Sequence, residues 1–212
     1  MNYQLRMYRH EYPGTLITFC GLDGSGKSTM IHLLADYLKQ NNKEVVLTKQ
    51  PTEAMRHTEI FRTYMDQEDH SRYAYRALSL MAAADRIQHV HQVILPALQE
   101  GKYVLCDRYY YSCLANLHAR GYEQDAWVHE ISQEIVKPDL AFFLDVPVSI
   151  AIQRVRSRPE ERSRYIDVQL QNRLHDEYKK IAANNAGIIL SSCDIVENTC
   201  QNMMSYIRRL RK

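Results

Sequence analysis

Eight consecutive residues, Gly21 to Ser28, fit the glycine-rich pattern GxxxxGK[ST] at every fixed position. Because glycine makes up about 7% of an average protein, such a match arises by chance in roughly one chain of this size in a hundred. An apolar run, 15–20, precedes the pattern, and a helical pattern begins near Lys27, as the motif requires. These residues therefore predict a strand, a phosphate-binding loop and a helix, in that order.

The chemistry expected of this loop is anion binding. Its glycines allow consecutive backbone N–H groups to curl around a phosphate, and the following helix points the positive end of its dipole at the same group. Lys27 can reach the β- and γ-phosphates, and the hydroxyl of Ser28 can bind Mg²⁺. We therefore expect Mg-ATP or Mg-GTP as a ligand. The predicted triphosphate site comprises Gly21, Gly24, Ser25, Gly26, Lys27 and Ser28.

Short apolar runs alternate with longer helical patterns along the whole chain. Such alternation predicts right-handed crossovers and an α/β fold, whose mostly parallel sheet is covered by helices on both faces. In these folds, ligands bind at the carboxyl ends of the strands. The expected strands are 15–20, 44–48, 103–106, 140–144 and 187–190, and the expected helices are 27–41, 71–99, 109–136, 148–183 and 194–211.

Length and composition limit the alternatives. The chain has 212 residues, and at roughly 150 residues per domain we expect one domain over 1–212, with a core over 14–212 after a polar extension, 1–13. Its 45% apolar and 25% charged residues are typical of a folded globule. The net charge of +2 is too small to indicate a general affinity for nucleic acid or acidic membranes. No apolar stretch approaches the ~18 residues of a membrane span, so we expect a cytoplasmic protein that acts on small molecules.

The segment 71–99 presents two distinct faces if it is helical. Ser79, Ala82 and Arg86 fall about one turn apart on one of them. A small alanine beside an arginine leaves room next to a positive charge, which suits a ligand, although a solvated helix charge is the commoner explanation of Arg86 taken alone. The other face is a continuous apolar stripe with spacings of three and four, comprising Tyr73, Ala77, Leu80, Ala84, Ile87, His91, Ile94 and Leu98.

Two later strand ends carry acidic residues. Asp107 ends the run 103–106 and is a candidate for holding the water shell of the metal, although a helix N-cap is the simpler use of such a residue. Arg108 follows directly and places a planar cation where an acceptor phosphate would lie, which favours the active-site interpretation. Asp145 ends the run 140–144 and leads into Pro147 at a helix start, so capping is the better explanation there.

A dense group of arginines occupies the segment 154–166. Phosphoryl transfer needs cations around the three equatorial oxygens and needs water kept away, and a mobile lid over 154–166 would do both. Since Ser25 offers no charge, another cation must stabilise the transferred group. The alternative is a solvated, charged helix end. The group comprises Arg154, Arg156, Arg158, Arg162 and Arg164, with Glu160 and Glu161 among them.

Several segments match, in order, the motifs of a single enzyme family. They are Phe19 through Thr29, Thr48 through Pro51, Ala84-Asp85-Arg86, Asp107-Arg108-Tyr109 with Ser112 and Ala115, and Pro138-Asp139-Leu140 with Leu144-Asp145 and Arg154 through Arg158. Over about residues 15–180 the chain thereby resembles the thymidylate kinases, within the nucleoside monophosphate kinases. One such motif is a weak signal, whereas the ordered series is a strong one.

This resemblance implies a P-loop NTP-binding fold with a five-stranded parallel sheet, an arginine-rich lid and a homodimer formed through helices. It also implies an enzyme that moves the γ-phosphoryl of ATP to the 5′-phosphate of a pyrimidine nucleotide, dTMP by default. The ATP site would then include Thr29, and the Mg²⁺ site would be Ser28 and Asp107. The apolar stripe of 71–99 is a plausible dimer surface, and core packing explains it equally well.

Carried over to the matching positions, the resemblance assigns roles around the acceptor. Arg108 would bind the acceptor phosphate, Asp23 would meet the sugar 3′-hydroxyl and Arg86 would contact the base. The catalytic arginine of the lid would be Arg158 or Arg162. The catalytic set would be completed by Lys27, Asp23 and Arg108, and the acceptor site by Lys49, Pro51, Ala82, Ser112, Cys113 and Asn116.

Four positions depart from the family pattern. Cys20 stands where the family usually has Glu, and Lys49 stands where it usually has Arg, which keeps the charge but loses the bidentate fork. Ala82 replaces an aromatic residue that stacks on the base. Asn116 replaces another that lies against the sugar, where an amide could bind a 2′-hydroxyl. UMP, CMP, dUMP or a modified pyrimidine nucleotide are therefore alternative acceptors.

The sequence argues against one other function class and leaves a second one open. A GTP-dependent switch needs an Asn-Lys-x-Asp motif after a later strand, but Asn42-Lys43 precedes the second predicted strand and lacks the Asp. A non-catalytic nucleotide binder with a vestigial loop stays open as an alternative.

Overall fold

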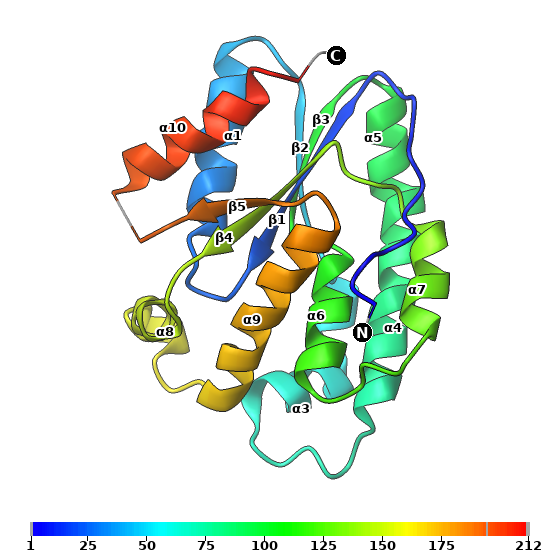
Figure 1. Cartoon of the computed structure of the whole chain (residues 1–212), viewed down its shortest axis with the longest axis vertical. Helices are drawn as coiled ribbons and strands as arrows, with labels where there is room; N and C mark the ends of the chain where they lie inside the picture. The colour runs from blue at the N-terminus through cyan, green and yellow to red at the C-terminus, as the bar shows by residue number, and fades with distance from the viewer. Residues whose placement is uncertain (1, 194, 211–212) are drawn as a thin grey trace.

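Five parallel strands form one sheet in a computed structural model that describes residues 2–193 and 195–210 (Figure 1). The strand order is β2-β3-β1-β4-β5, and every neighbouring pair is parallel. Each predicted strand is present with its ends shifted by at most one residue, so the predicted parallel α/β sheet is confirmed. The bounds are Thr15–Gly21 (β1), Val45–Lys49 (β2), Tyr103–Asp107 (β3), Leu140–Asp145 (β4) and Ile188–Ser191 (β5).

The register of the sheet brings the carboxyl ends of neighbouring strands to one edge. All seven residues of the central strand β1 are buried. Phe19 of β1 pairs with Asp107 of β3, which also pairs with Lys49 of β2. On the other side, Gly21 pairs with Leu144 of β4. The loops after these four strands therefore meet where ligands bind in parallel sheets.

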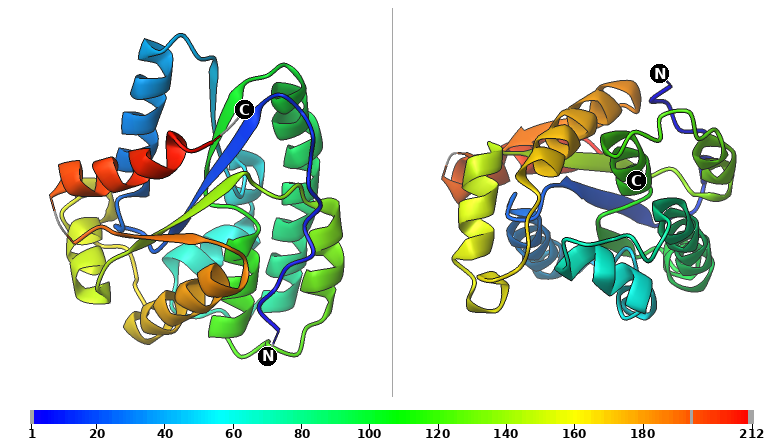
Figure 2. Two further views of the ribbon diagram at one scale, coloured as in Figure 1. Left: turned by 45° about the horizontal axis from the view of Figure 1, so that its top comes forward. Right: turned by 90° about the horizontal axis from the view of Figure 1, so that it is seen from below.

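Helices cover both faces of this sheet, as predicted (Figures 1 and 2). They connect successive parallel strands, which only a crossover on one face of the sheet can do. The helical segments are Lys27–Gln40 (α1), Glu53–Arg56 (α2), Glu59–Asp66 (α3), Tyr75–His89 (α4), Val90–Ile94 (η1, a π turn), Leu95–Gln99 (α5), Tyr111–Ala119 (α6), Trp127–Ile131 (α7), Ser132–Glu134 (η2), Val148–Arg156 (α8), Pro159–Glu161 (η3), Val168–Asn184 (α9) and Val196–Ile207 (α10).

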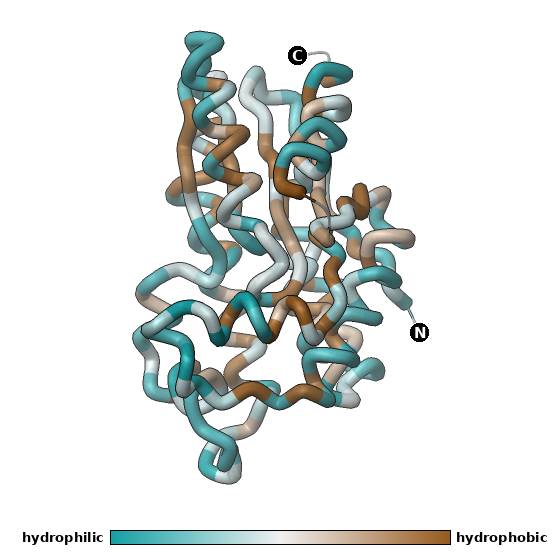
Figure 3. Tube along the Cα trace, turned by 90° about the vertical axis from the view of Figure 1, so that its left-hand side faces the viewer, coloured by the Kyte–Doolittle hydropathy of each residue, from teal (hydrophilic) through white to brown (hydrophobic). Residues whose placement is uncertain are grey.

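Two hydrophobic clusters lie on opposite sides of β1. Ile17 and Phe19 belong to the cluster under α1 and α10. Leu16 and Cys20 belong to the cluster under α4, α5, α6 and α9. This alternation follows from the two-residue period of a strand. Figure 3 shows the hydrophobic residues gathered along the middle of the molecule and the hydrophilic ones in the outer loops.

Two long predicted helices are interrupted. The segment 109–136 forms α6 and α7, separated by a turn in which Gly121 has a φ of +85°. The segment 148–183 forms α8 and α9, because Pro159 cannot continue a helix and the chain turns away until Asp167. Asp167 then caps α9 by accepting a hydrogen bond from the N–H of Leu170 at 2.9 Å. The predicted helix 194–211 is present as α10, and its predicted end residues lie outside the described residues.

Helices α2 and α3 were not predicted. Both follow Pro51 and occupy a segment whose apolar residues do not form a long stripe. A local signal was nevertheless present, because Thr58 accepts a hydrogen bond from the N–H of Phe61 at 3.4 Å and Glu59 occupies the first turn. These two short helices supply one wall of the cavity described below.

The apolar stripe predicted over 71–99 is only partly a core feature. Ile94 and Leu98 are buried, but Leu80 is 44% exposed, and Ala77 and Ala84 are also exposed. Core packing therefore explains only the C-terminal end of the stripe. The reason is the π turn η1, whose wider i→i+5 winding changes which face of the continuing helix points toward the sheet.

The N-terminal segment packs along the body of the protein. Leu5 is buried, and its N–H donates a hydrogen bond to Oδ1 of Asn185 at 2.9 Å. His10 lies 3.1 Å from the carboxylate of Asp139. The segment predicted as a polar extension thus makes specific contacts with the core. Within the described ranges, no helix combines the length and the apolarity needed to cross a membrane.

Candidate active site

The glycine-rich loop between β1 and α1 adopts a conformation that requires its glycines. Gly24 and Gly26 have φ angles of +82° and +91°, a region that residues with a Cβ rarely adopt. A Cβ on Gly24 would also lie 2.2 Å from the backbone oxygen of Ala151. The loop leads directly into α1, whose first residue is Lys27. The N–H groups at that helix start are therefore available to an anion.

Lys27 is buried at the centre of this loop. Its ammonium donates hydrogen bonds to the carbonyl oxygens of Gly21 and Leu22, at 3.2 Å and 2.7 Å. Burial, followed by the neighbouring charge of Arg108, lowers the pKa of Lys27 to about 8. Among the described residues the lysine therefore lacks a strong anionic partner, a role that phosphate oxygens can fill.

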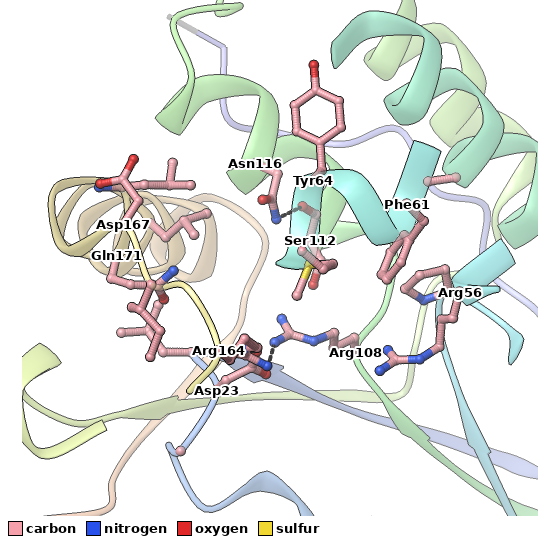
Figure 4. Close-up of a pocket in the computed structure, with 18 of the residues that line it drawn as sticks. Asp23, Arg56, Phe61, Tyr64, Arg108, Ser112, Asn116, Arg164, Asp167 and Gln171 are labelled. Carbon is pink, nitrogen blue, oxygen red and sulfur yellow. Dashed lines mark hydrogen bonds and ion pairs between the residues drawn. The ribbon is translucent and has the colours of Figure 1, made fainter. Parts of the chain in front are cut away.

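Asp23 joins the loop to two arginines from distant parts of the chain (Figure 4). Its carboxylate lies 2.5 Å from Arg108 and 3.0 Å from Arg164. Burial by itself raises the pKa of Asp23, but the charges of Arg108, Lys27 and Arg164 together bring it well below its ordinary value. Asp23 is therefore a carboxylate at neutral pH and holds both guanidiniums in place.

Arg108 occupies an unusual backbone conformation directly after β3. Its φ is +67°, which costs of order 1–3 kcal/mol for a residue with a Cβ and is typical of functional sites. Its N–H donates to the oxygen of Phe19 at 2.8 Å, so β1 fixes the turn. The guanidinium also donates to the carbonyl of Gly21 at 3.3 Å and to the hydroxyl of Tyr178 at 3.1 Å. These contacts aim the side chain across the loop.

Asp107 has the properties expected of a residue that holds a hydrated metal ion. One of its oxygens lies 3.4 Å from the ammonium of Lys49. The other, Oδ1, is buried and has no hydrogen-bond partner among the described residues. Asp107 and Ser28 line the same cavity, and together they offer the oxygen ligands that Mg²⁺ prefers. The residues present therefore fit Mg²⁺.

A cavity of about 380 Å³ begins at the loop and extends between α3, α4, α6 and α9. Arg86 of α4 is buried along this cavity and donates to the carbonyl of Ala82 at 2.8 Å, and its Nε has no hydrogen-bond partner in the described part of the chain. Ser79 and Ala82 also line the cavity, so the second face of the predicted helix is the face that meets it. The cavity therefore lies on the helix face for which the sequence predicted room beside Arg86, and its use by a ligand stays a prediction.

The first turns of α6 provide the opposite wall. Ser112 accepts a hydrogen bond from the hydroxyl of Tyr178 at 3.1 Å. Asn116 donates from its amide nitrogen to the carbonyl of Ser112 at 2.9 Å. Its amide oxygen has no partner among the described residues, so an acceptor atom is left on the wall. Cys113 lies between these two residues and is buried.

The arginines of the lid differ in where they lie. Arg158 lines the cavity and lies 3.4 Å from Glu161. Arg162 is exposed and does not line the cavity, and its carbonyl accepts a hydrogen bond from Arg156. Arg164, which the sequence analysis placed in the arginine group but not among the two catalytic candidates, lines the cavity and reaches Asp23. Of the two predicted candidates, only Arg158 is near the site.

Asp145 does not cap a helix, and that prediction was wrong. Its side chain lies 2.6 Å from His175 and 3.3 Å from Lys179, both on α9. The N-cap of α8 is Pro147, and no side chain caps that helix. The error arose because a sequence shows the helix that follows Asp145 but not the helix packed beside its strand.

The cavity gathers most of the residues that the sequence predicted for the site. Gly21 and Ser25 shape the loop from behind and do not line the cavity, and Arg162 lies outside it. Those that do line the cavity are Asp23, Gly24, Gly26, Lys27, Ser28, Thr29, Lys49, Pro51, Ala82, Arg86, Asp107, Arg108, Ser112, Cys113, Asn116 and Arg158.

Comparison with known proteins agrees with this arrangement. A family model described as "Thymidylate kinase" matches residues 19–202. The chain belongs to the thymidylate kinase family. It is 40% identical over 171 residues to a "Probable thymidylate kinase" of Pyrococcus horikoshii, covering 80% of this chain and 83% of that one. Identity to proteins named "Thymidylate kinase" is 35% over 190 residues in Sulfurihydrogenibium sp. (87% and 92% covered) and 33% over 204 residues in Desulfotalea psychrophila (94% and 97% covered).

The part of the chain that matches the thymidylate kinase family contains the whole cavity. Every lining residue falls within 19–202, and the sheet is the five-stranded parallel sheet that the resemblance implied. Sequence reasoning missed Phe61 and Tyr64 of α3, together with Arg120 at the end of α6, all of which line the cavity. Only the Thr58 cap pointed to α3, and no pattern pointed to Arg120.

Proposed function

We propose that this chain transfers the γ-phosphoryl group of ATP to the 5′-phosphate of a pyrimidine nucleoside monophosphate, with dTMP as the default acceptor. One observation carries the proposal: the loop lysine Lys27 and the arginines Arg86 and Arg108 line a single cavity. An enzyme that joins two nucleotides must hold two phosphate groups side by side, with a base pocket beyond the acceptor phosphate. The relatives named thymidylate kinase support the same reaction.

On the donor side, the loop N–H groups and Lys27 would bind the β- and γ-phosphates. Lys27 would exchange its two carbonyl partners for phosphate oxygens, because hydrogen bonds between a charged donor and a charged acceptor are stronger. Ser28 and the water shell held by Asp107 would bind Mg²⁺, which when present neutralises charge on the phosphates. The unpartnered Oδ1 of Asp107 supports this role.

On the acceptor side, Arg108 would bind the nucleotide's phosphate. A phosphate monoester is largely dianionic at neutral pH because its second pKa is about 6, so its oxygen can attack without a general base. The protein must then supply orientation and positive charge rather than proton transfer. Asp23, which already holds Arg108 at 2.5 Å, keeps the guanidinium aimed at the junction of the two substrates.

We further propose that the lid supplies the cation for the transferred group. Arg158 and Arg164 line the cavity, and Arg164 already contacts Asp23 beside the phosphate loop. Their positions favour them over Arg162, which is exposed. Closure of this segment over the phosphates would also exclude water, which otherwise competes as a phosphoryl acceptor.

The choice of acceptor sugar remains open to two candidates. Asn116 lines the cavity, and because its amide nitrogen is engaged with the carbonyl of Ser112, its oxygen is the atom left to act as an acceptor. A 2′-hydroxyl could donate to this oxygen, which favours ribonucleotides such as UMP as an alternative to dTMP. The ratio of kcat/KM for dTMP, dUMP and UMP separates these candidates.

We also propose that the chain forms a homodimer through α4. Its outer face presents Leu80 and Met81, which are 44% and 42% exposed, beside exposed Ala77 and Ala84. A contiguous apolar face on a helix is typical of an interface between protein chains.

A coupled assay of ADP release tests the proposed reaction. Wild-type protein with Mg-ATP should turn over at least one of dTMP, dUMP, UMP and CMP, and Lys27→Ala should lower kcat by orders of magnitude. Turnover of none of these acceptors by a folded protein would refute the proposed reaction. Equal nucleotide binding without any turnover would instead indicate a non-catalytic binder.

A further inference from the structure

The strand end that carries Lys49 lies at the edge of the sheet. β2 is the outermost strand of the described sheet, so β3 is its only neighbour there. The ladder places Lys49 opposite Asp107, and the N–H of Gln50 then donates to the carbonyl of Asp107 at 2.9 Å. The second side of an edge strand has no ladder partners. Other contacts must therefore fix the direction in which this strand end points.

The extended chain around Lys49 alternates between two sides. Lys49 and Pro51 line the cavity. The side chains that alternate with them contact α4 and do not line the cavity; they are Thr48, Gln50 and Thr52. This alternation follows from the two-residue period of an extended chain. Contacts on the α4 side therefore decide how the cavity side is presented.

His89 of α4 contacts both residues that flank Lys49. Its Nε2 lies 2.6 Å from Oγ1 of Thr48, and its Nδ1 lies 2.9 Å from Nε2 of Gln50. Burial lowers the pKa of His89, although the charge of Asp85 acts in the opposite direction. The ring is therefore neutral at pH 7 and has one donor and one acceptor nitrogen. Since the amide nitrogen of Gln50 can only donate, Nδ1 is the acceptor and Nε2 donates to Thr48.

The side chain of Gln50 depends on this contact. Gln50 is completely buried, and the hydrogen bond to His89 is the only one that its side chain makes among the described residues. His89 is buried as well. Because an unpaired amide donor in the interior is costly, the contact restricts the orientation of the strand end on the α4 side.

A second residue of α4 holds the same stretch of chain. Asp85 lies four positions before His89, and so on the same helix face. It accepts hydrogen bonds from the N–H of Thr52, at 2.9 Å, and from the hydroxyl of Thr52. The chain is thus attached to α4 both before and after the two residues that face the cavity.

Lys49 is placed mainly by its backbone. Its ammonium lies 3.4 Å from Oδ2 of Asp107, and its side chain is 42% exposed. A lysine stem has four flexible carbons. The position of its charge beside Asp107 and Arg108 therefore depends on where the strand end lies.

We propose that His89 is a positioning residue, which holds Lys49 at the acceptor phosphate by fixing the residues on either side of it. This inference rests on the proposed kinase reaction, in which Arg108 binds that phosphate and Lys49 belongs to the same acceptor site. His89 does not line the cavity. It therefore acts through the strand end and not by contact with a nucleotide.

Steady-state kinetics of wild type, His89→Leu, Lys49→Met and the double variant test this inference. His89→Leu removes both hydrogen bonds, and Lys49→Met removes the charge. Each single variant should raise KM for the acceptor about 10-fold, because a small displacement of a binding group is enough for such a loss. The values of kcat and of KM for ATP should change less than threefold. In the double variant, His89→Leu should add less than a threefold rise, because the side chain that it positions is already gone.

Two further variants separate positioning from stability. His89→Asn keeps an acceptor for the amide of Gln50 but loses the contact with Thr48, so it should raise the acceptor KM less than His89→Leu does. His89→Asn also takes the place of His89→Leu in the cycle if the latter does not fold. His32→Leu is the matched control, because it makes the same substitution at an exposed position of α1 outside the cavity, and it should change nothing. Partial unfolding lowers the apparent kcat and not KM, so a merely structural role would not produce the expected rise in KM.

Two results would overturn the proposal. One is an unchanged acceptor KM in His89→Leu, and the other is an equal rise in KM with and without Lys49. Isothermal titration with dTMP and UMP in the absence of ATP makes the same comparison without turnover. A Kd that depends on His89 only while Lys49 is present, in a protein that phosphorylates nothing, would refute the kinase reaction alone. A wild type that binds neither nucleotide would refute both.

Discussion

Raising the pH from 7 to 9 should weaken ATP binding about tenfold, and Lys27 is the cause. Burial, followed by the nearby charge of Arg108, lowers the pKa of this lysine from 10.5 to about 8 in the free protein. A bound triphosphate places negative charge beside the ammonium, which restores the charged form as the favoured one. Above pH 8, binding should therefore be accompanied by the uptake of a proton.

The size of the effect follows from the fraction of charged lysine. With a pKa of about 8, about nine-tenths of the free protein carries a charged Lys27 at pH 7, and about one-tenth does so at pH 9. Because the competent fraction falls about tenfold, the apparent Kd rises about tenfold, which corresponds to about 1.4 kcal/mol. In a solvated lysine with a pKa near 10.4, the same change of pH would have almost no effect.

Isothermal titration with Mg-ATP at pH 7, 8 and 9 measures this dependence. Two buffers with different ionisation enthalpies give the number of protons taken up, which should approach one at pH 9. Lys27→Arg serves as the control, because arginine stays charged throughout this range, so its weaker binding should not vary with pH. A wild-type affinity that is constant from pH 7 to 9, or the same decline in Lys27→Arg, would refute the reasoning.

Three further substitutions test other parts of the site. Asp23→Asn should destabilise the fold by about 2 kcal/mol at pH 7, less than for a fully buried pair because Asp23 is partly exposed. The charges of Arg108 and its neighbours outweigh burial and lower the pKa of Asp23. The difference in unfolding free energy between wild type and variant, measured in urea, should therefore have its full value above about pH 4 and shrink as the pH falls further. Asp107→Asn should raise the Mg²⁺ concentration for half-maximal ADP release roughly 10- to 100-fold; an unchanged requirement would remove Asp107 from the metal site. Leu80→Glu should convert a dimer to a monomer in light scattering, whereas a wild-type monomer would exclude the α4 interface.

The sheet and the phosphate loop could be predicted because local sequence alone determines them. A buried parallel strand needs a short continuous apolar run, and all five runs that were predicted as strands are strands in the structure. The roles of Gly24 and Gly26 in the loop could be predicted for the same reason, because their positive φ angles disfavour other residues whatever surrounds them. The register of the sheet then placed Asp107 and Arg108 next to the loop, as expected for parallel strand ends.

The position of Arg120 could not be predicted, because it depends on contacts between distant segments. Arg120 looks like a polar residue at a helix end until α4 places Tyr75 under its guanidinium. The outward face of α4 is a similar case, since a stripe containing Leu80 reads equally well as core or as surface. A sequence pattern gives the face on which a residue lies, but only packing decides what that face meets.

The charge of the whole chain gave little indication of an anion site, and the structure shows why. Eight basic and five acidic residues line the cavity, a surplus of three positive charges, whereas the entire chain has a net charge of only +2. The rest of the protein is therefore close to neutral, and the positive charge is concentrated where Lys27, Arg86 and Arg108 lie. A concave site of one sign with partly desolvated walls focuses the field on anions that can enter it. Selectivity for a small phosphorylated ligand over a long polyanion thus follows from the enclosure of the charge rather than from its amount.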